Sequence, residues 1–171
     1  DALELKKNSE VIMPAFTIIS CIYPAIRNKL KPILVDSDIK NWNLDIDLLK
    51  KKITPKTKCI IAPHIYGLPV DMSPLMKIAK EKKIYVIEDT AEAIGLDYNG
   101  KKCGSFGDLS TFSFYANKHI TTGEGGAVLT DNQEDYEKMK KMINLDFDNS
   151  KRFQHENFYW NYRLSGLQAA L

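Results

Sequence analysis

Short, unbroken apolar runs alternate along this chain with segments of helical periodicity. The runs lie at residues 10–14, 32–36, 59–65, 84–88, 111–114 and 127–130. Unbroken apolar runs are typical of strands that are buried on both faces, as in a parallel sheet. The intervening periodicity predicts helices at residues 18–28, 45–52, 72–82 and 133–144. The alternation therefore predicts a layered α/β domain with a mostly parallel sheet.

Polar and turn residues follow several of these predicted strands. Ligands of open α/β sheets bind beyond the carboxyl ends of the strands. Four aspartates lie near such ends, namely Asp36, Asp71, Asp89 and Asp131. The turn at residues 66–69 and the segment 89–95 also follow strands. We therefore expect the functional site at this edge of the sheet, while residues 144–159, which have no clear period, predict a loop.

Composition narrows the class of protein. A chain of 171 residues with 44% hydrophobic and 27% charged residues suits one soluble domain with a proper core. A net charge of +2 gives no basic surface for nucleic acid, and no apolar run is long enough to span a bilayer. We therefore expect no nucleic-acid partner, no membrane partner and a cytoplasmic location.

The cysteines point the same way. Cys21, Cys59 and Cys103 lie far apart, and no CxxC pair occurs. An odd, dispersed set argues against a disulfide framework and against a zinc site. A reducing compartment and the absence of a metal centre are the resulting expectations.

Lys118 is the strongest candidate for catalysis. Aromatic residues precede it, glycines follow it, and it stands apart from the other lysine clusters, so we expect it to be partly buried. A buried lysine amine can form a Schiff base with a carbonyl compound. The alternative for any single lysine is a solvated surface charge, and spacing alone leaves that alternative open.

Two further groups complete a recognisable set of donors and acceptors. Pyridoxal phosphate (PLP) needs a lysine for its aldehyde, a carboxylate for its ring nitrogen and small donors for its phosphate. Asp89 either pairs with the ring nitrogen or caps a following helix. Ser113 either binds the phosphate or is a half-buried strand hydroxyl. Glu88 points away from Asp89 in a strand, so only one of the two can face the site.

The remaining candidates are weaker. The Gly-rich segment 121–126 is either a phosphate loop or flexible backbone, and it lacks the Walker and dinucleotide fingerprints. Arg163 is either a surface charge or a bidentate clamp for an anion. His64 and His119 are interpreted as ordinary, hydrogen-bonded histidines.

Taken together, the motifs resemble the DegT/DnrJ/EryC1/StrS family of PLP-dependent nucleotide-sugar aminotransferases, whose fold is that of aspartate aminotransferase (PLP fold type I, a three-layer α/β/α large domain). The resemblance covers nearly the whole chain. Segments near residues 17–20, 117–123 and 152–156 are most similar to perosamine-forming members. The segments that carry the family resemblance are residues 11–17, 53–58, 63–71, 86–95, 104–114, 118–126 and 161–170.

The resemblance implies roles for individual residues. Lys118 would carry the cofactor and shuttle the proton, and Asp89 would pair with the pyridine nitrogen. Glu92 stands where the family often has Gln or His near the ring hydroxyl, and Ser113 would bind the phosphate. Asn161 would reach the phosphate in the neighbouring subunit of a homodimer with shared sites. Arg163 would lie near that interface and bind substrate.

The resemblance also implies an activity. The reaction would move an amino group, from glutamate as a rule, to a 4-keto-6-deoxy nucleotide sugar of the GDP-perosamine type for surface polysaccharide. A PLP-dependent sugar 3-dehydrase is the first alternative, but those relatives carry His at the position of Lys118, and His119 comes one residue late. A truncated, non-catalytic domain is the second alternative, and a plain Rossmann-type nucleotide binder fits poorly.

Three departures from the family pattern stand out. Ile18 replaces the aromatic residue that usually stacks on the cofactor ring. The phosphate-binding Gly-Thr turn is expected before Asp1, and the small C-terminal domain is expected after Leu171. Residues 1–171 are therefore interpreted as a partial PLP-binding large domain that lacks an N-terminal segment and the C-terminal small domain.

Overall fold

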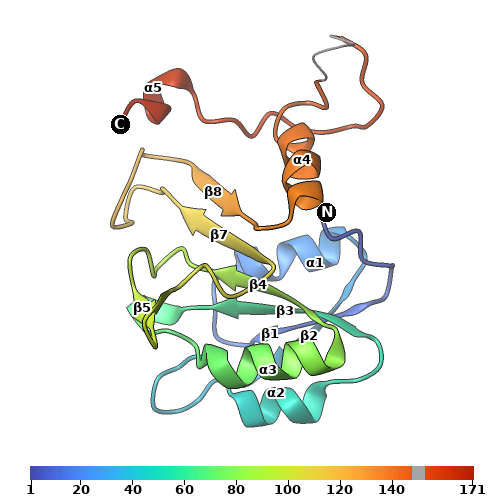
Figure 1. Cartoon of the computed structure of the whole chain (residues 1–171), viewed down its shortest axis with the longest axis vertical. Coiled ribbons are helices and arrows are strands. Elements are labelled where there is room, and N and C mark those ends of the chain that lie inside the picture. Colours follow the sequence, from blue (N-terminus) through green and yellow to red (C-terminus); the bar gives the residue numbers. More distant parts are fainter. Residues whose placement is uncertain (148–152) are drawn as a thin grey trace.

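The computed structural model describes residues 1–147 and 153–171. Within these ranges, six strands form one sheet in the order β2-β1-β3-β4-β7-β8 (Figure 1). All neighbours run parallel except β7 and β8, which are antiparallel. The mostly parallel sheet predicted from the apolar runs is confirmed. The strands are β1 (Glu10–Pro14), β2 (Lys31–Val35), β3 (Thr57–Pro63), β4 (Tyr85–Asp89), β7 (Leu109–Ser113) and β8 (Gly126–Leu129).

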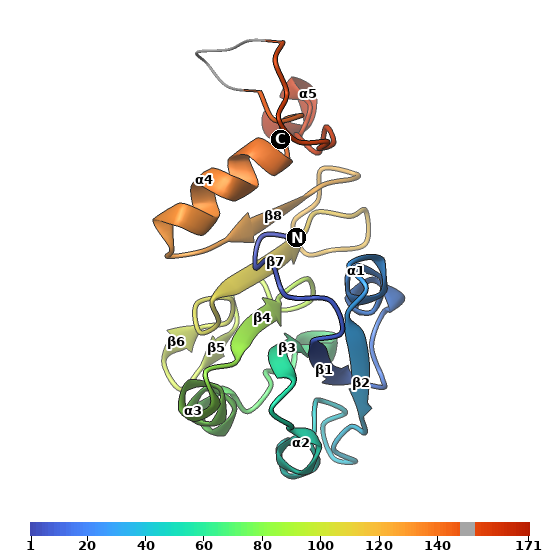
Figure 2. The same cartoon turned by 90° about the vertical axis from the view of Figure 1, so that its right-hand side faces the viewer.

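Helices cover both faces of this sheet, which gives the expected three layers. Figure 2 shows α2 and α3 on one face and α1 on the other. The helix expected at residues 18–28 is divided into a 3₁₀ turn and the short helix α1, with Pro24 in the first turn of α1. The helical elements are η1 (Ile19–Cys21), α1 (Tyr23–Arg27), α2 (Ile46–Lys52), η2 (Ile65–Gly67), α3 (Met72–Lys82), α4 (Gln133–Met142) and α5 (Gly166–Ala169).

Side-chain alternation along the strands builds a separate apolar cluster on each face. Ile12, Ile60 and Val86 pack with α2 and α3, whereas Met13 and Cys59 pack beneath α1. Each large aliphatic side chain buried in this way stabilises the fold by about 1.5–3 kcal/mol. Residues of even number in β4 therefore face α3, and residues of odd number face α1.

The carboxyl ends of three central strands are level with one another. Pro63 of β3 pairs with Asp89 of β4, and Asp89 pairs with Thr111 of β7. The segments after these strands therefore meet at one edge of the sheet. Asp131 does not belong there, contrary to expectation, because β8 runs in the opposite direction and ends at the other edge.

The last described segment returns to the loop after β7. Ser165 and Gln168 form a capping box that starts α5, and the Gln168 amide donates to the Glu124 carbonyl at 3.0 Å. A Cβ at Gly125 would lie 2.5 Å from Leu164, so glycine lets the segment approach this closely. The chain end and the loop that carries Lys118 are therefore packed together.

Two features complete the fold. The sequence did not predict the hairpin of β5 (Asp97–Tyr98) and β6 (Lys101–Lys102). The loop expected at residues 144–159 contains no regular helix or strand in its described parts, and its residues 148–152 lie outside the described residues. No helix in the described ranges is long and apolar enough to cross a membrane.

Candidate active site

Lys118 lies on the loop that follows β7, at the carboxyl edge of the sheet. Its Nζ is 3.4 Å from Glu92 Oε1. Its side chain is 15% exposed, in contrast to the 63% exposure of Lys31 on the surface. The expected partial burial of this amine is confirmed, and its partner is a carboxylate.

Glu92 connects that amine to a backbone turn. While Oε1 faces Lys118, Oε2 accepts a hydrogen bond of 2.8 Å from the Tyr66 backbone N–H. Tyr66 has a φ of 48°, in the left-handed region that non-glycine residues rarely adopt. The turn therefore holds an unusual conformation at the point where its amide meets Glu92.

Asp89 ends β4 and faces the α1 side of the sheet. Its Oδ1 accepts from the Ala91 backbone N–H at 3.1 Å, and its Oδ2 accepts from Cys21 Sγ at 3.4 Å. No helix follows Asp89 directly, so the helix-cap interpretation is wrong, and Asp89 forms a local turn with Ala91 instead.

The Cys21 thiol orients Asp89 from the helical layer. Burial, the largest cause, and the neighbouring Asp89 carboxylate together raise the pKa of Cys21 to about 12. The thiol therefore stays protonated and donates to the carboxylate, and Thr17 Oγ1 lies 3.4 Å from the same sulfur. Nothing in the spacing of Cys21 indicated this contact.

Ser113 is the last residue of β7. Its hydroxyl oxygen accepts from the Tyr115 backbone N–H at 3.3 Å, and no described residue accepts its proton. The hydroxyl can therefore donate to an anion. In the loop beyond it, the hydroxyls of Thr121 and Thr122 donate to loop carbonyls. Those hydroxyls stabilise the loop itself.

Asn161 and Arg163 are placed apart from this group. Arg163 Nε donates to Asn161 Oδ1 at 3.0 Å, and both residues are exposed. No described contact joins either one to Lys118, Glu92 or Asp89. The structure therefore brings together four of the six predicted site residues at one edge, and it pairs the other two with each other. Arg152, which also carried part of the resemblance, lies outside the described residues.

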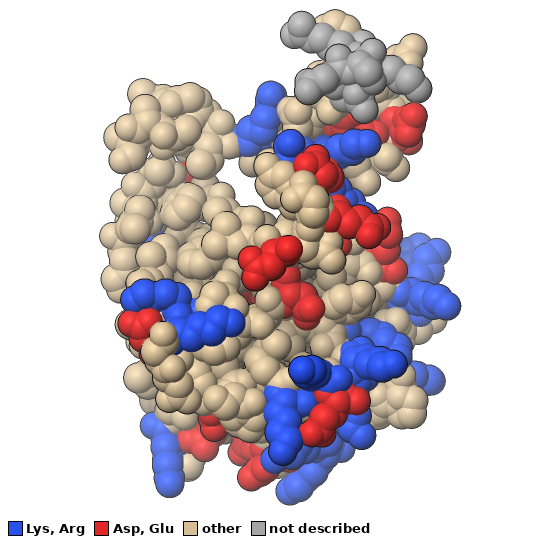
Figure 3. Space-filling view, viewed as in Figure 1, with Lys and Arg blue, Asp and Glu red and all other residues tan. Residues whose placement is uncertain are grey.

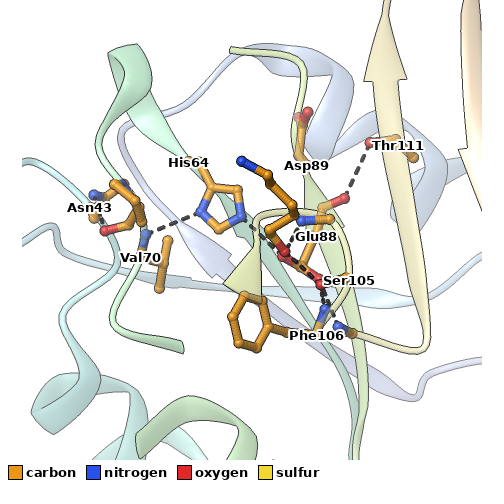
Figure 4. Close-up of polar contacts among 12 residues, drawn as sticks. Asn43, His64, Val70, Glu88, Asp89, Ser105, Phe106 and Thr111 are labelled. Atoms are coloured by element: carbon orange, nitrogen blue, oxygen red, sulfur yellow. Dashed lines mark hydrogen bonds and ion pairs between the residues drawn. The ribbon is translucent and has the colours of Figure 1, made fainter. Parts of the chain in front are cut away.

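A buried polar network lies directly behind the site (Figure 4). Glu88 is fully buried and points toward α3, so Asp89 alone of the two faces the site. His64 Nε2 lies 3.1 Å from Glu88 Oε2, and the Val70 backbone N–H donates to His64 Nδ1 at 3.1 Å. The interpretation of His64 as a hydrogen-bonded core histidine is confirmed, but the sequence did not indicate its partner.

Backbone amides saturate the Glu88 carboxylate. It accepts from the N–H groups of Gly104, Phe106 and Gly107 at 2.6–2.7 Å. Burial raises the pKa of Glu88, but the hydrogen bonds from His64 and from these amides outweigh burial, and the net pKa is lowered. Glu88 is therefore a buried anion with every acceptor position in use.

The chemistry of these groups fits PLP. A partly buried amine, a carboxylate held by two donors and a hydroxyl with a spare proton lie at the same edge of the sheet. They match the aldehyde, the ring nitrogen and the phosphate respectively. In the orientation of Figure 1, charged side chains gather on the lower and right-hand parts of the molecular surface, whereas the upper left of the surface is mostly uncharged (Figure 3).

Fold and site together define an α/β domain of the PLP-dependent aminotransferase type, and comparison with known proteins gives the family. The profile of the DegT/DnrJ/EryC1/StrS aminotransferase family matches residues 1–171, and the chain belongs to this family. The family and its solved aminotransferases imply PLP as the cofactor.

Three similar proteins illustrate the range of the family. A GDP-perosamine synthase of Escherichia coli O157:H7 is 40% identical over 99% of this chain and 47% of its own length. A GDP-4-keto-6-deoxy-D-mannose 3-dehydratase of Yersinia pseudotuberculosis is 41% identical over 78% of this chain and 34% of its own length. The solved aminotransferase from Psychrobacter cryohalolentis is 33% identical, with a TM-score of 0.91 over 99% of this chain and 46% of that chain. The chain thus spans about half the length of the curated relatives it matches.

Proposed function

We propose that this protein transfers an amino group, with glutamate as donor, to a 4-keto-6-deoxy nucleotide sugar of the GDP-perosamine type. The observation that carries the proposal is the partly buried Lys118 at the same sheet edge as Asp89 and Ser113. The similarity to GDP-perosamine synthases supports the choice of sugar. Such a product would serve surface polysaccharide synthesis in the cytoplasm.

The side chains divide the work of this reaction. PLP supplies an aldehyde and an electron-withdrawing ring when it is bound. Lys118 would hold the cofactor and then move the proton, because its partly buried amine lies 3.4 Å from the Glu92 carboxylate. Asp89 would hold the ring nitrogen in its charged form, and Ser113 would donate to the phosphate. Glu92 orients the Lys118 amine.

The proposal extends to assembly. Asn161 and Arg163 are exposed and make no described contact with the Lys118 group of their own chain, which suits residues that reach a neighbouring subunit. The α1 side also exposes large apolar side chains, among them Ile18, Ile19 and Tyr23. A homodimer with shared sites accounts for both features, and sedimentation equilibrium on the protein at its full natural length tests it. A monomer would contradict the shared site.

The activity is tested directly on the full-length protein. Purified protein is mixed with PLP, glutamate and GDP-4-keto-6-deoxymannose, and the sugar product is read by mass spectrometry. The wild type is expected to give an amino sugar, and Lys118→Ala is expected to give none. Product formation by Lys118→Ala at the wild-type rate would contradict the proposal.

A matched lysine provides the control. Lys138 is also partly buried and also pairs with a glutamate, Glu4, at 3.1 Å, but it lies on α4, which follows the end of β8 at the opposite edge of the sheet. Lys138→Ala is expected to keep wild-type activity. The same assay covers the 3-dehydratase alternative, because loss of a sugar hydroxyl without gain of nitrogen would identify that reaction.

A further inference from the structure

The buried Glu88–His64 pair has a defined protonation pattern. A backbone N–H can only donate, so the bond from Val70 N requires that His64 Nδ1 carries no proton. The proton of the neutral ring therefore lies on Nε2, which donates to Glu88 Oε2. The pair is one anion with a charge-assisted hydrogen bond, which is stronger and more directional than a neutral one.

The His64 side chain holds the two ends of the segment 64–70 together. His64 is the first residue of this segment, and its ring contacts Glu88 through Nε2 and the backbone N–H of Val70, the last residue, through Nδ1. Asn43, which is also buried, holds the middle, because it accepts from Ile65 N at 3.0 Å and donates to the Leu68 carbonyl at 2.9 Å. The turn η2 is therefore clamped from the core by buried side chains.

The clamped turn leads directly to the candidate active site. Tyr66, inside η2, has the strained φ of 48° and points its amide at Glu92 Oε2. Glu92 in turn faces the Lys118 amine with its other oxygen. A continuous set of contacts thus runs from Glu88 through His64, the turn and Glu92 to Lys118. Strain of this kind persists only where surrounding contacts fix it.

The opposite side of Glu88 is equally constrained. Three amides of the loop 104–107 donate to the carboxylate, and two of them belong to glycines. A Cβ at Gly104 would lie 2.6 Å from the Phe112 ring, and one at Gly107 would lie 2.7 Å from the Val86 carbonyl. These glycines let the loop amides close around Glu88, so the anion is anchored on one side and acts on the turn on the other.

We infer that Glu88 and His64 are positioning residues for the active-site lysine. They fix the turn 65–67, the Tyr66 amide of that turn fixes Glu92, and Glu92 sets where the Lys118 amine meets the cofactor. The inference rests on the proposed function in so far as Lys118 is the residue that carries PLP. Neither Glu88 nor His64 touches Lys118 itself.

Two substitutions of His64 separate its contacts. Asn places an acceptor near the Nδ1 position and keeps the Val70 bond, whereas Gln places a donor near Nε2 and keeps the Glu88 bond. Because the connection needs both bonds, His64→Asn and His64→Gln are each expected to alter the circular dichroism of the visible cofactor band and to speed PLP release about tenfold. Glu88→Gln is expected to do the same.

A second buried carboxylate gives the matched control. Glu10 accepts hydrogen bonds from Thr54 and Thr57 at the other edge of the sheet, and no contact among residues 1–147 and 153–171 connects it to Lys118. Glu10→Gln is expected to lower thermal stability while the cofactor band and the release rate stay at wild-type values. If both His64 variants fold but keep the wild-type band and release rate, the pair is only structural and the inference is wrong.

A measurement without cofactor separates this inference from the proposed function. Hydrogen exchange of the full-length protein, free of PLP, reads the Tyr66 amide directly. Exchange at Tyr66 is expected to be about tenfold faster in His64→Asn than in the wild type or in Glu10→Gln. Unchanged exchange would overturn the positioning role whatever the protein does with PLP. Failure of the wild type to bind PLP, with faster exchange in His64→Asn, would instead contradict the proposed function alone.

Discussion

The two edges of the central sheet each bury a glutamate, and a comparison of the two carboxylates shows how the edge with the candidate active site differs from the other. Glu10, at the start of β1, is 5% exposed, and Glu88, near the end of β4, is fully buried. Both accept several hydrogen bonds, and both have a lowered pKa, for Glu10 chiefly because Thr54 donates to it. Burial and satisfied hydrogen bonds therefore do not distinguish a site from a core.

What differs is the set of groups to which each carboxylate connects. Within the described part of the chain, the Glu10 carboxylate contacts two threonines and the exposed Lys31, and no further polar contact leads from it to Lys118. Glu88 fixes His64 and a glycine-containing loop, and its contacts continue to Glu92 and Lys118. Ligands of parallel sheets bind at the carboxyl edge, and in this protein that edge also contains the continuous polar network.

The largest contrast between the edges is expected in catalysis. Asp89→Asn removes the negative charge that is proposed to pair with the ring nitrogen of PLP, and turnover is expected to fall by at least about 10²-fold. Because Asp89 is only partly buried, the substitution should change the free energy of unfolding of the protein by about 0.5 kcal/mol or less. Steady-state kinetics beside Glu10→Gln provides the check. A loss of turnover in Glu10→Gln as large as in Asp89→Asn would break the distinction between the edges.

The second largest contrast is expected in the loss of stability when each of the two glutamates is replaced by glutamine. In Glu88→Gln the new amide nitrogen must face a backbone N–H, since both carboxylate oxygens accept from amides. We expect a loss of about 3 kcal/mol in the free energy of unfolding. In Glu10→Gln the remaining oxygen still accepts from threonine, and the expected loss is about 1 kcal/mol. Urea unfolding measures both, and equal losses would contradict the hydrogen bonds described for Glu88.

Low pH should reduce the difference in stability between the wild type and Glu88→Gln. The pKa of Glu88 is lowered in the folded state relative to its ordinary value of 4.5, so folding favours the charged form. The stabilising contribution of ionised Glu88 is complete above pH 4.5 and disappears as the pH falls through the lowered folded-state pKa. Glu88→Gln should therefore lose less stability than the wild type on acidification. Unfolding experiments at decreasing pH measure this difference. An equal loss in the free energy of unfolding of both proteins would contradict the direction of the pKa shift.

The smallest expected effect concerns two thiols on the α1 side of the sheet. Burial is the main cause that raises the pKa of both Cys21 and Cys59 to about 12. At about pH 8 the thiolate fraction is then about 10⁻⁴, so neither residue should react with iodoacetamide until the protein unfolds. Peptide mass spectrometry reads both sites. Rapid alkylation of Cys21 in the folded protein would show that its thiol does not donate to Asp89 as described.

The apolar runs predicted the sheet well because buried parallel strands have a simple signature. Five parallel strands, the carboxyl-edge site and the opposite directions of Glu88 and Asp89 all follow from period and order. The reversal of β8 did not follow, because an apolar run has no direction, and Asp131 was placed at the wrong edge for that reason. The hairpin of residues 97–102 was not predictable from apolar runs, because its strands are only two residues long.

The site was predictable where side chains carry the chemistry and unpredictable where contacts are long-range. Residue type and order make Lys118, Asp89 and Ser113 candidates, and the resemblance to the family gives each of them a role. The contact from Cys21 to Asp89 spans 68 positions, and the amide that meets Glu92 belongs to a turn 26 positions away. Such pairs depend on how the layers pack, which no local pattern encodes.

Chemical trapping of the cofactor identifies the lysine to which it is attached. The full-length protein is loaded with PLP, reduced with borohydride to make the lysine attachment permanent, digested and analysed by mass spectrometry. We predict that the cofactor is found on the peptide that contains Lys118 and on no other lysine. Attachment to a different lysine, or no attachment at all, would contradict the assignment of the carboxyl edge as the active site.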